Sequence, residues 1–155
     1  MSTGPIEFPR HIPFAQLLGF ELWAFGDGKA EIRVPLAPGL MNSLDVAHGG
    51  VVMTLLDVVM AHAARSADIA AEGAAGSTVV TIEMKTSFMR PALGVLRGVG
   101  ELMHRSASMA FTEGRVFDNA GHLCAHATGT FKLVHSKGRA ARHPGTEPPD
   151  KETTP

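Results

Sequence analysis

Residues 48 to 57 read HGGVVMTLLD, and the apolar character of this stretch continues to about Arg65. The segment has high helix propensity and is apolar on every side of a helical pattern, which predicts a buried helix from Gly49 to about Arg65. One carboxylate, Asp57, lies inside it. Burying a carboxylate is costly unless it is hydrogen-bonded, paired or functional. The helix therefore decides the fold and carries the first candidate site residue.

The segments on either side of this helix alternate with the period of strands. Before it, a short helix (12–19), a hairpin of two strands (20–25 and 29–36) and a loop (37–47) are expected. After a connection at 68–77, strands are expected at 78–89, 95–104, 109–117 and 122–134, joined by turns at 90–94, 105–108 and 118–121. Because helix and strand segments are segregated, the order predicts an α+β fold with an antiparallel sheet of about six strands.

The strand at 78–89 shows the clearest alternation. It places Val80, Ile82, Met84 and Phe88 on one face and Thr81, with its polar neighbours, on the other. We therefore expect a single apolar face along this strand.

A sheet of this size covers only part of a helix that is apolar all round. The helix would be about 25 Å long at about 1.5 Å per residue. Its remaining face needs a second cover, and another copy of the chain is the simplest source. The sequence thus predicts a homodimer.

Composition places limits on the remaining properties. The chain has 155 residues and fits one domain, expected at 1–135, whereas the Pro-rich, charged segment 136–155 is expected to be a disordered tail. A net charge of −1 gives no electrostatic argument for a nucleic-acid or membrane partner. The single cysteine, Cys124, excludes an internal disulfide framework. Because we find neither a secretory signal nor an apolar stretch long enough to span a bilayer, we expect a cytoplasmic protein.

The candidate site begins with Asp57 and with the start of the helix. A structural alternative for Asp57 is a hydrogen bond to a neighbouring loop. At His48-Gly49-Gly50, glycines let a ligand approach free N–H groups at the positive end of a helix. This arrangement suits a carbonyl oxygen that gains negative charge in acyl transfer. The alternative there is a simple turn into a helix.

The spacing of these two candidates has a geometric consequence. Gly49 and Asp57 are separated by about 12 Å along the axis of one helix. A single carbonyl cannot touch both groups of the same helix. If both act, Asp57 must meet Gly49 of another subunit, which places the site at a dimer interface.

Two further polar residues could support this chemistry. Asn42, in the loop before the helix, could orient a water or a carbonyl, or could be an ordinary turn residue. The hydroxyl of Thr81 could hold Asp57 or a water, or could lie on the surface of a strand.

Other catalytic patterns are missing. The eight histidines are scattered, and neither HExxH, CxxC nor a GxSxG elbow occurs, so we expect no metal, no cofactor and no Ser-His-Asp catalysis. Arg90, Arg105 and Lys132 are near strand ends and could bind phosphates; the alternative is solvated surface charge.

Several pieces of the sequence together resemble one family. They are GLMNSLDVAHGG (39–50), VVMTLLD (51–57), TIEMKTSFMRPALG (81–94), HRSASMAF (104–111) and DNAGHLCAHATGTFKLV (118–134). From about Phe14 to Val134 the chain resembles the hotdog-fold acyl-CoA thioesterases, specifically the phenylacetate-degradation-type (PaaI-like) branch. Two positions depart from the pattern, since Asp45 and Ser106 stand where glycine is common.

The resemblance implies a central helix wrapped by an antiparallel sheet and paired into dimers, often tetramers. It implies that Asp57 is the catalytic carboxylate and that the Gly49 N–H polarises the thioester carbonyl. Asn42 and His48 would shape that pocket, and Thr81 would lie near the carboxylate. The residues expected to bind the substrate or its CoA portion are Gly50, Arg90, Arg105, Ser106 and Ser108.

The expected reaction is hydrolysis of an acyl-CoA thioester to a carboxylic acid and free CoA. Asp57 would act as general base on water, or as nucleophile through an anhydride. Two alternatives stay open: hydration or dehydration of an enoyl thioester, for which His48 is present, and a non-catalytic acyl-CoA-binding protein. The acyl group could be aryl or a medium-length aliphatic chain.

Overall fold

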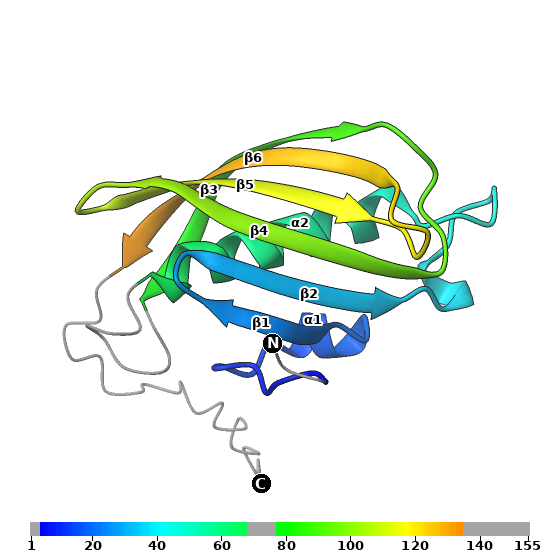
Figure 1. The fold of residues 1–155 in the computed structure, drawn as a ribbon, viewed down its shortest axis with the longest axis horizontal. Helices are drawn as coiled ribbons and strands as arrows, with labels where there is room; N and C mark the ends of the chain where they lie inside the picture. Colours follow the sequence, from blue (N-terminus) through cyan, green and yellow to red (C-terminus); the bar gives the residue numbers. More distant parts are fainter. Residues whose placement is uncertain (1–3, 68–76, 135–155) are drawn as a thin grey trace, which may run out of the picture.

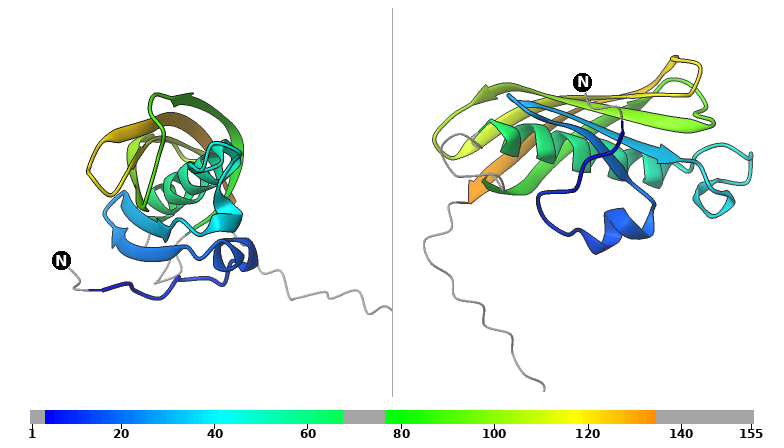
Figure 2. Two further views of the ribbon diagram at one scale, coloured as in Figure 1. Left: turned by 90° about the vertical axis from the view of Figure 1, so that its right-hand side faces the viewer. Right: turned by 60° about the horizontal axis from the view of Figure 1, so that its bottom comes forward.

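The computed structural model describes residues 4–67 and 77–134. It confirms the predicted α+β hotdog fold, in which a six-stranded antiparallel sheet curls around one long helix (Figures 1 and 2). The elements in chain order are α1 (Pro13–Leu17), β1 (Glu21–Gly26), β2 (Lys29–Pro35), η1 (Pro38–Leu40), α2 (Gly49–Ser66), β3 (Thr78–Phe88), β4 (Val95–Arg105), β5 (Met109–Phe117) and β6 (Leu123–Val134). The predicted tail at 136–155, the domain boundary at 135 and most of the predicted connection at 68–77 lie outside the described residues.

The strand order in the sheet is β1-β2-β4-β5-β6-β3. After α2 the chain crosses to the far edge, where β3 pairs antiparallel with β6. Within the described residues, β3 has no strand on its other side. An edge strand of 11 residues offers a row of backbone N–H and C=O groups for pairing with another chain.

The core lies between α2 and the concave face of the sheet. Its largest fully buried side chains include Leu55, Leu56 and Met60 from α2 and Leu22, Ile32, Leu96 and Phe131 from the strands. Each such side chain contributes about 1.5–3 kcal/mol relative to exposure.

Glycines allow the sheet to approach the helix closely. A Cβ at Gly100 would lie 2.5 Å from the backbone oxygen of Val59, and one at Gly98 would lie 2.9 Å from Cγ of Leu55. Real Cβ atoms do not come this close, so β4 can pack on α2 only without side chains at these positions. The close packing fixes the height of α2 above the sheet, and with it the position of Asp57.

The sheet covers one side of α2 and leaves the other open. Met53 is 41% exposed, and Thr54, Asp57, Val58 and Ala61 are half-buried. The described protomer therefore covers this all-round apolar helix only in part.

The expectation of one apolar face along β3 is wrong. The register with β6 shifts between Thr81 and Glu83, which makes a β-bulge at Ile82. Thr81 pairs with Phe131, whose side chain lies in the core, and Met84 pairs with Gly129. Because directly opposite residues share a face, Thr81 and Met84 both face α2, whereas Val80 points away from it.

Candidate functional site

The bulge in β3 brings Thr81 to Asp57. The hydroxyl Oγ1 of Thr81 donates a hydrogen bond of 2.8 Å to Oδ1 of Asp57. The carboxylate is half-buried, on the open side of α2. The Thr81 hydroxyl holds Oδ1, and among residues 4–67 and 77–134 no group donates a hydrogen bond to Oδ2. A carboxylate fixed through one oxygen can use the other to accept a proton or to attack a carbonyl.

Two pockets adjoin Asp57 and Thr81. The larger, of about 470 Å³, is mostly apolar and is lined by Ile12, Phe14, Met53, Val58 and Met84 together with Thr54. The smaller, of about 230 Å³, has a more polar wall, to which Arg10, His62, Arg65 and Thr78 contribute. The carboxylate thus lies between an apolar space and a basic one.

The start of α2 forms a second centre. Nδ1 of His48 accepts a hydrogen bond of 2.9 Å from the Gly50 N–H, so His48 acts as the N-cap. Within residues 4–67 and 77–134, the Gly49 N–H has no hydrogen-bond acceptor. The cap therefore uses the N–H of Gly50 and leaves that of Gly49 at the positive end of the helix.

A pocket of about 340 Å³ lies at this end and includes Gly49, Asn42 and Arg90. Asn42 shapes the loop, since its Oδ1 accepts from the Leu44 N–H at 2.9 Å. Arg90 Nη1 donates to the Leu123 carbonyl at 2.9 Å. The structure thus brings Asn42, Arg90 and the helix start together, as a group separate from Asp57.

Cys124 also lines the pocket at Gly49. Burial, and secondarily the charge of Asp118, raises the pKa of its thiol. Its Sγ lies 3.3 Å from the His122 carbonyl oxygen and 3.5 Å from that of Pro91, and its single S–H can donate to either. A protonated, hydrogen-bonded thiol is a poor nucleophile, so Cys124 is a packing residue here.

The remaining predicted residues lie elsewhere in the protomer. Arg105 is the last residue of β4, and Ser106 and Ser108 belong to the turn between β4 and β5, at the end of the sheet opposite the start of α2 (Figure 1). Ser106 Oγ accepts from the Met109 N–H at 3.0 Å and stabilises that turn. One protomer does not bring these residues to Gly49 or Asp57.

No residue is shared between the pocket at Gly49 and the two pockets at Asp57. Within the described chain, the two candidate centres therefore face separate spaces. This separation agrees with the distance worked out from the helix rise.

His62 is a group near the site that sequence reasoning missed as a candidate. It lies about 1.4 turns after Asp57, is 1% exposed, and lines the smaller pocket at Asp57. Its Nδ1 lies 2.7 Å from the Val58 carbonyl, which can only accept, so Nδ1 carries the hydrogen. Burial lowers the pKa of His62 to about 4, with the Arg65 charge acting in the same direction. The only signal in the sequence was a second ionisable residue inside the apolar run.

Arg65, at the end of α2, is buried as well. Its Nε donates to the Ser77 carbonyl at 3.0 Å, and burial, followed by the charge of Arg10, lowers its pKa. A guanidinium stays protonated at neutral pH despite such a shift. Two positive charges therefore adjoin the smaller pocket.

In the described ranges no group of three or more His, Cys, Asp or Glu side chains is arranged to hold a metal ion. Among the same residues, no helix combines the length and apolarity that a bilayer crossing requires.

Fold and site together define a hotdog protein with a carboxylate on its central helix and an N–H donor at the helix start. Comparison with known proteins gives the family. Residues 44–125 match the family model of the thioesterase superfamily, and the chain belongs to that superfamily. This places it among the thioester hydrolases in general.

Individual relatives agree with this. A Mycobacterium tuberculosis protein with a provisional esterase name is 30% identical over 129 residues, covering 83% of this chain and 89% of the relative. A conserved protein of Pseudomonas aeruginosa has a similar structure, with a TM-score of 0.75, 30% identity, and coverage of 84% of this chain and 100% of that one. The Escherichia coli PaaI protein, from the phenylacetic acid degradation operon, shares the fold, with a TM-score of 0.70, 18% identity, and coverage of 79% and 84%.

Proposed function

We propose that the protein is an acyl-CoA thioesterase that hydrolyses a thioester to a carboxylic acid and free CoA. The observation that carries the proposal is the Asp57 carboxylate, held by Thr81 on the open side of α2 beside an apolar pocket of about 470 Å³. A carboxylate that retains an unpaired oxygen next to apolar space suits attack on a hydrophobic acyl group.

Asp57 serves as general base on water, or as nucleophile through an anhydride. The Thr81 hydroxyl holds Oδ1 and so orients Oδ2 toward the reacting atoms. The Gly49 N–H donates to the carbonyl oxygen as it gains negative charge, and the positive end of α2 adds to this stabilisation. His48 acts indirectly: by accepting the Gly50 N–H it fixes the first turn that presents Gly49.

The active site is shared by two subunits of a homodimer. Support comes from the separate pockets of Gly49 and Asp57 in one protomer and from the open side of α2. The free edge of β3, with Val80 and Ile82 51% and 55% exposed, suits antiparallel pairing with a second copy. A homotetramer, as a pair of such dimers, is the assembly that the resemblance implies.

The CoA portion lies on the side of Gly49. Arg90 lines that pocket and Gly50 follows Gly49 in α2, whereas Arg105, Ser106 and Ser108 lie at the distant end of β4 and in the turn after it. The latter three contact CoA only if another subunit brings its β4–β5 turn to the pocket. The reaction takes place in the cytoplasm, where acyl-CoA thioesters are available.

The first test is release of free thiol from aryl and aliphatic acyl-CoAs. Replacing Asp57 with Asn should lower kcat by at least about 100-fold, the low end of the range for a general base. Asp27→Asn is the matched control, because Asp27 has a positive φ of 50° that Asn tolerates and lies in the β1–β2 turn. Full thiol release by Asp57→Asn would remove Asp57 from the mechanism. Conversion of enoyl-CoA esters without release of thiol would favour a hydratase instead.

Gly49→Pro tests the oxyanion donor with little change to the helix. Gly49 is the first residue of α2, and His48 before it has φ −61° and ψ 136°, an extended conformation that tolerates a following proline. The substitution deletes one N–H, and kcat should fall by about 100- to 1,000-fold.

Mixing the two variants tests the shared site. A dimer of Asp57→Asn with Gly49→Pro has one doubly defective site and one intact site, provided the two residues act across the interface. A random mixture would then regain about a quarter of the wild-type sites. Lack of any recovery, with subunit exchange verified, would place both residues in the same subunit's site.

A further inference from the structure

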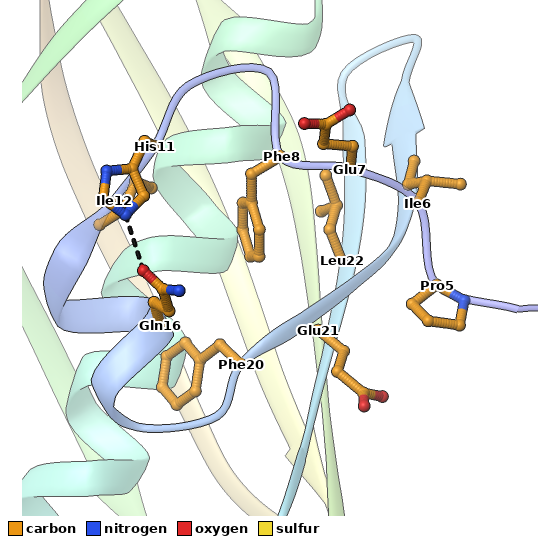
Figure 3. A pocket seen from close by; sticks show the side chains of 10 residues that line it. All are labelled: Pro5, Ile6, Glu7, Phe8, His11, Ile12, Gln16, Phe20, Glu21 and Leu22. Atoms are coloured by element: carbon orange, nitrogen blue, oxygen red, sulfur yellow. Dashed lines mark hydrogen bonds between the residues drawn. The ribbon is translucent and has the colours of Figure 1, made fainter.

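The N-terminal segment, residues 4–20, runs beside β1 and α2 and encloses a hollow of about 370 Å³ (Figure 3). Phe8, Phe20 and Leu22 supply much of its apolar wall. On one side His11 Nε2 and Gln16 Oε1 lie 2.7 Å apart, which links the chain just before α1 to the helix itself. The hollow shares no polar catalytic group with the candidate site.

Ile12 lies between this hollow and the candidate site. It lines the hollow and also both pockets that contain Asp57. It is half-buried and packs against the core, so its position is fixed. A second contact closes the same boundary, since the Phe8 ring meets the buried His62 ring edge-on with centroids 5.4 Å apart. The hollow is thus separated from Asp57 by a small number of side chains.

The larger pocket at Asp57 is the better place for a hydrocarbon chain. Phe14, Met53, Val58 and Met84 give it an apolar lining. The smaller pocket adjoins the guanidinium groups of Arg10 and Arg65, to which an alkyl chain offers no hydrogen-bond acceptor in place of water. A thioester whose carbonyl is at Asp57 would therefore extend its acyl chain over Met53 and Val58 toward α1.

We propose that Ile12 is the residue that ends the acyl pocket and so limits the length of the acyl chain that the enzyme accepts. The inference rests on the proposed thioesterase function. Replacing Ile12 with Ala removes three carbon atoms from the wall and joins the acyl pocket to the hollow behind it. A longer chain then buries its last methylenes among Phe8, Phe20 and Leu22.

The test is kcat/KM along the series of saturated straight-chain acyl-CoAs from butanoyl to hexadecanoyl. Each additional methylene that Ile12→Ala allows to be buried should raise kcat/KM by about fourfold, which corresponds to about 0.8 kcal/mol. With room for two methylenes, kcat/KM for a long substrate divided by kcat/KM for a short one should therefore rise by about tenfold or more over wild type. Ile12→Phe should change the ratio in the opposite direction, and Ile12→Val should stay close to wild type.

Leu17→Ala is the matched control. Leu17 is the last residue of α1, whose N-cap is Ile12; it is 79% exposed and lines none of the three pockets. It should leave the chain-length profile unchanged. Thermal unfolding of all variants separates a loss of folded protein, which lowers kcat/KM for every substrate alike, from a change in the ratio.

The outcomes are distinct. A wild-type profile retained by both Ile12→Ala and Ile12→Phe would overturn the inference and leave the proposed function standing. A uniform loss across the series would assign Ile12 a structural role and overturn it too. Absence of thiol release by the wild type from every ester would overturn the proposed function, and the inference with it.

Discussion

His62 should make the protein sensitive to acid in a way that one substitution removes. Burial among Phe8, Phe25 and the helix holds its pKa at about 4, whereas in the unfolded chain it is near its usual value of 6.5. The unfolded state therefore binds more protons between these values, and the stability contributed by neutral His62 is present in full above about pH 6.5. It is lost as the pH falls toward 4.

The expected magnitude follows from the two pKa values. Lowering the pH from 7.5 to 4 should reduce the free energy of unfolding by about 3 kcal/mol through this residue alone. In His62→Leu the titrating group is absent. The variant also loses the hydrogen bond to Val58, but that carbonyl keeps its helical N–H partner. The difference in free energy of unfolding between wild type and variant should therefore change by about 3 kcal/mol, in favour of the variant, as the pH falls from 7.5 to 4.

Urea unfolding followed by circular dichroism, at one protein concentration and at several pH values, measures this shift. Other groups titrate in the same range. Glu113, whose pKa is lowered chiefly by its hydrogen bond to His126, also loses stabilisation in acid. Its effect is common to both proteins and cancels in the difference. Parallel pH profiles for wild type and His62→Leu would show that His62 is not held neutral by burial, and would refute the reasoning.

Three further substitutions test the packing and the site. Gly100→Ala places a Cβ against the Val59 backbone and should lower the free energy of unfolding by about 1–3 kcal/mol in urea titrations. Gly26→Ala places its Cβ in open space and should cost less. Equal costs would contradict the packing argument. His48→Ala removes the N-cap and should cost about 1 kcal/mol in the same assay, and no loss would show that the cap is not stabilising. Thr81→Val removes the donor to Asp57 and should lower kcat about tenfold, whereas Thr81→Ser keeps the hydroxyl and should keep most of kcat. Equal kcat values for the two variants would exclude the hydrogen bond from catalysis.

Much of the fold was predictable because periodicity reports burial directly. The helix from Gly49 begins at the predicted residue, since the glycines and the preceding histidine mark its cap. The strands after it were found from their period of two, and the turn DNAG closes a hairpin between β5 and β6. The position of β3 at the sheet edge, however, depends on the crossover after α2, which no local pattern records.

The bulge in β3 shows why part of the site could not be predicted from alternation alone. A strict period of two puts Met84 and Val80 on one face, opposite Thr81. One extra residue at Ile82 reverses the phase, so Thr81 and Met84 both face α2. A bulge depends on the register with β6, which is a non-local property. The register shift that made the predicted apolar face wrong has a second effect. It lets β3 supply both a hydrogen-bond donor to Asp57 and an apolar wall to the adjoining pocket.

One protomer explains only in part why a carboxylate lies in an apolar helix. There Asp57 is half-buried, held by Thr81, and open on the side of Met53. Water on that side would weaken any charge interaction with an oxyanion that develops beside Asp57, because charge interactions are far stronger in a low dielectric. A second subunit that covers the open side of α2 would both exclude this water and bring its own Gly49 to Asp57. In the proposed enzyme, the same contact that buries the rest of the helix thus completes the catalytic site.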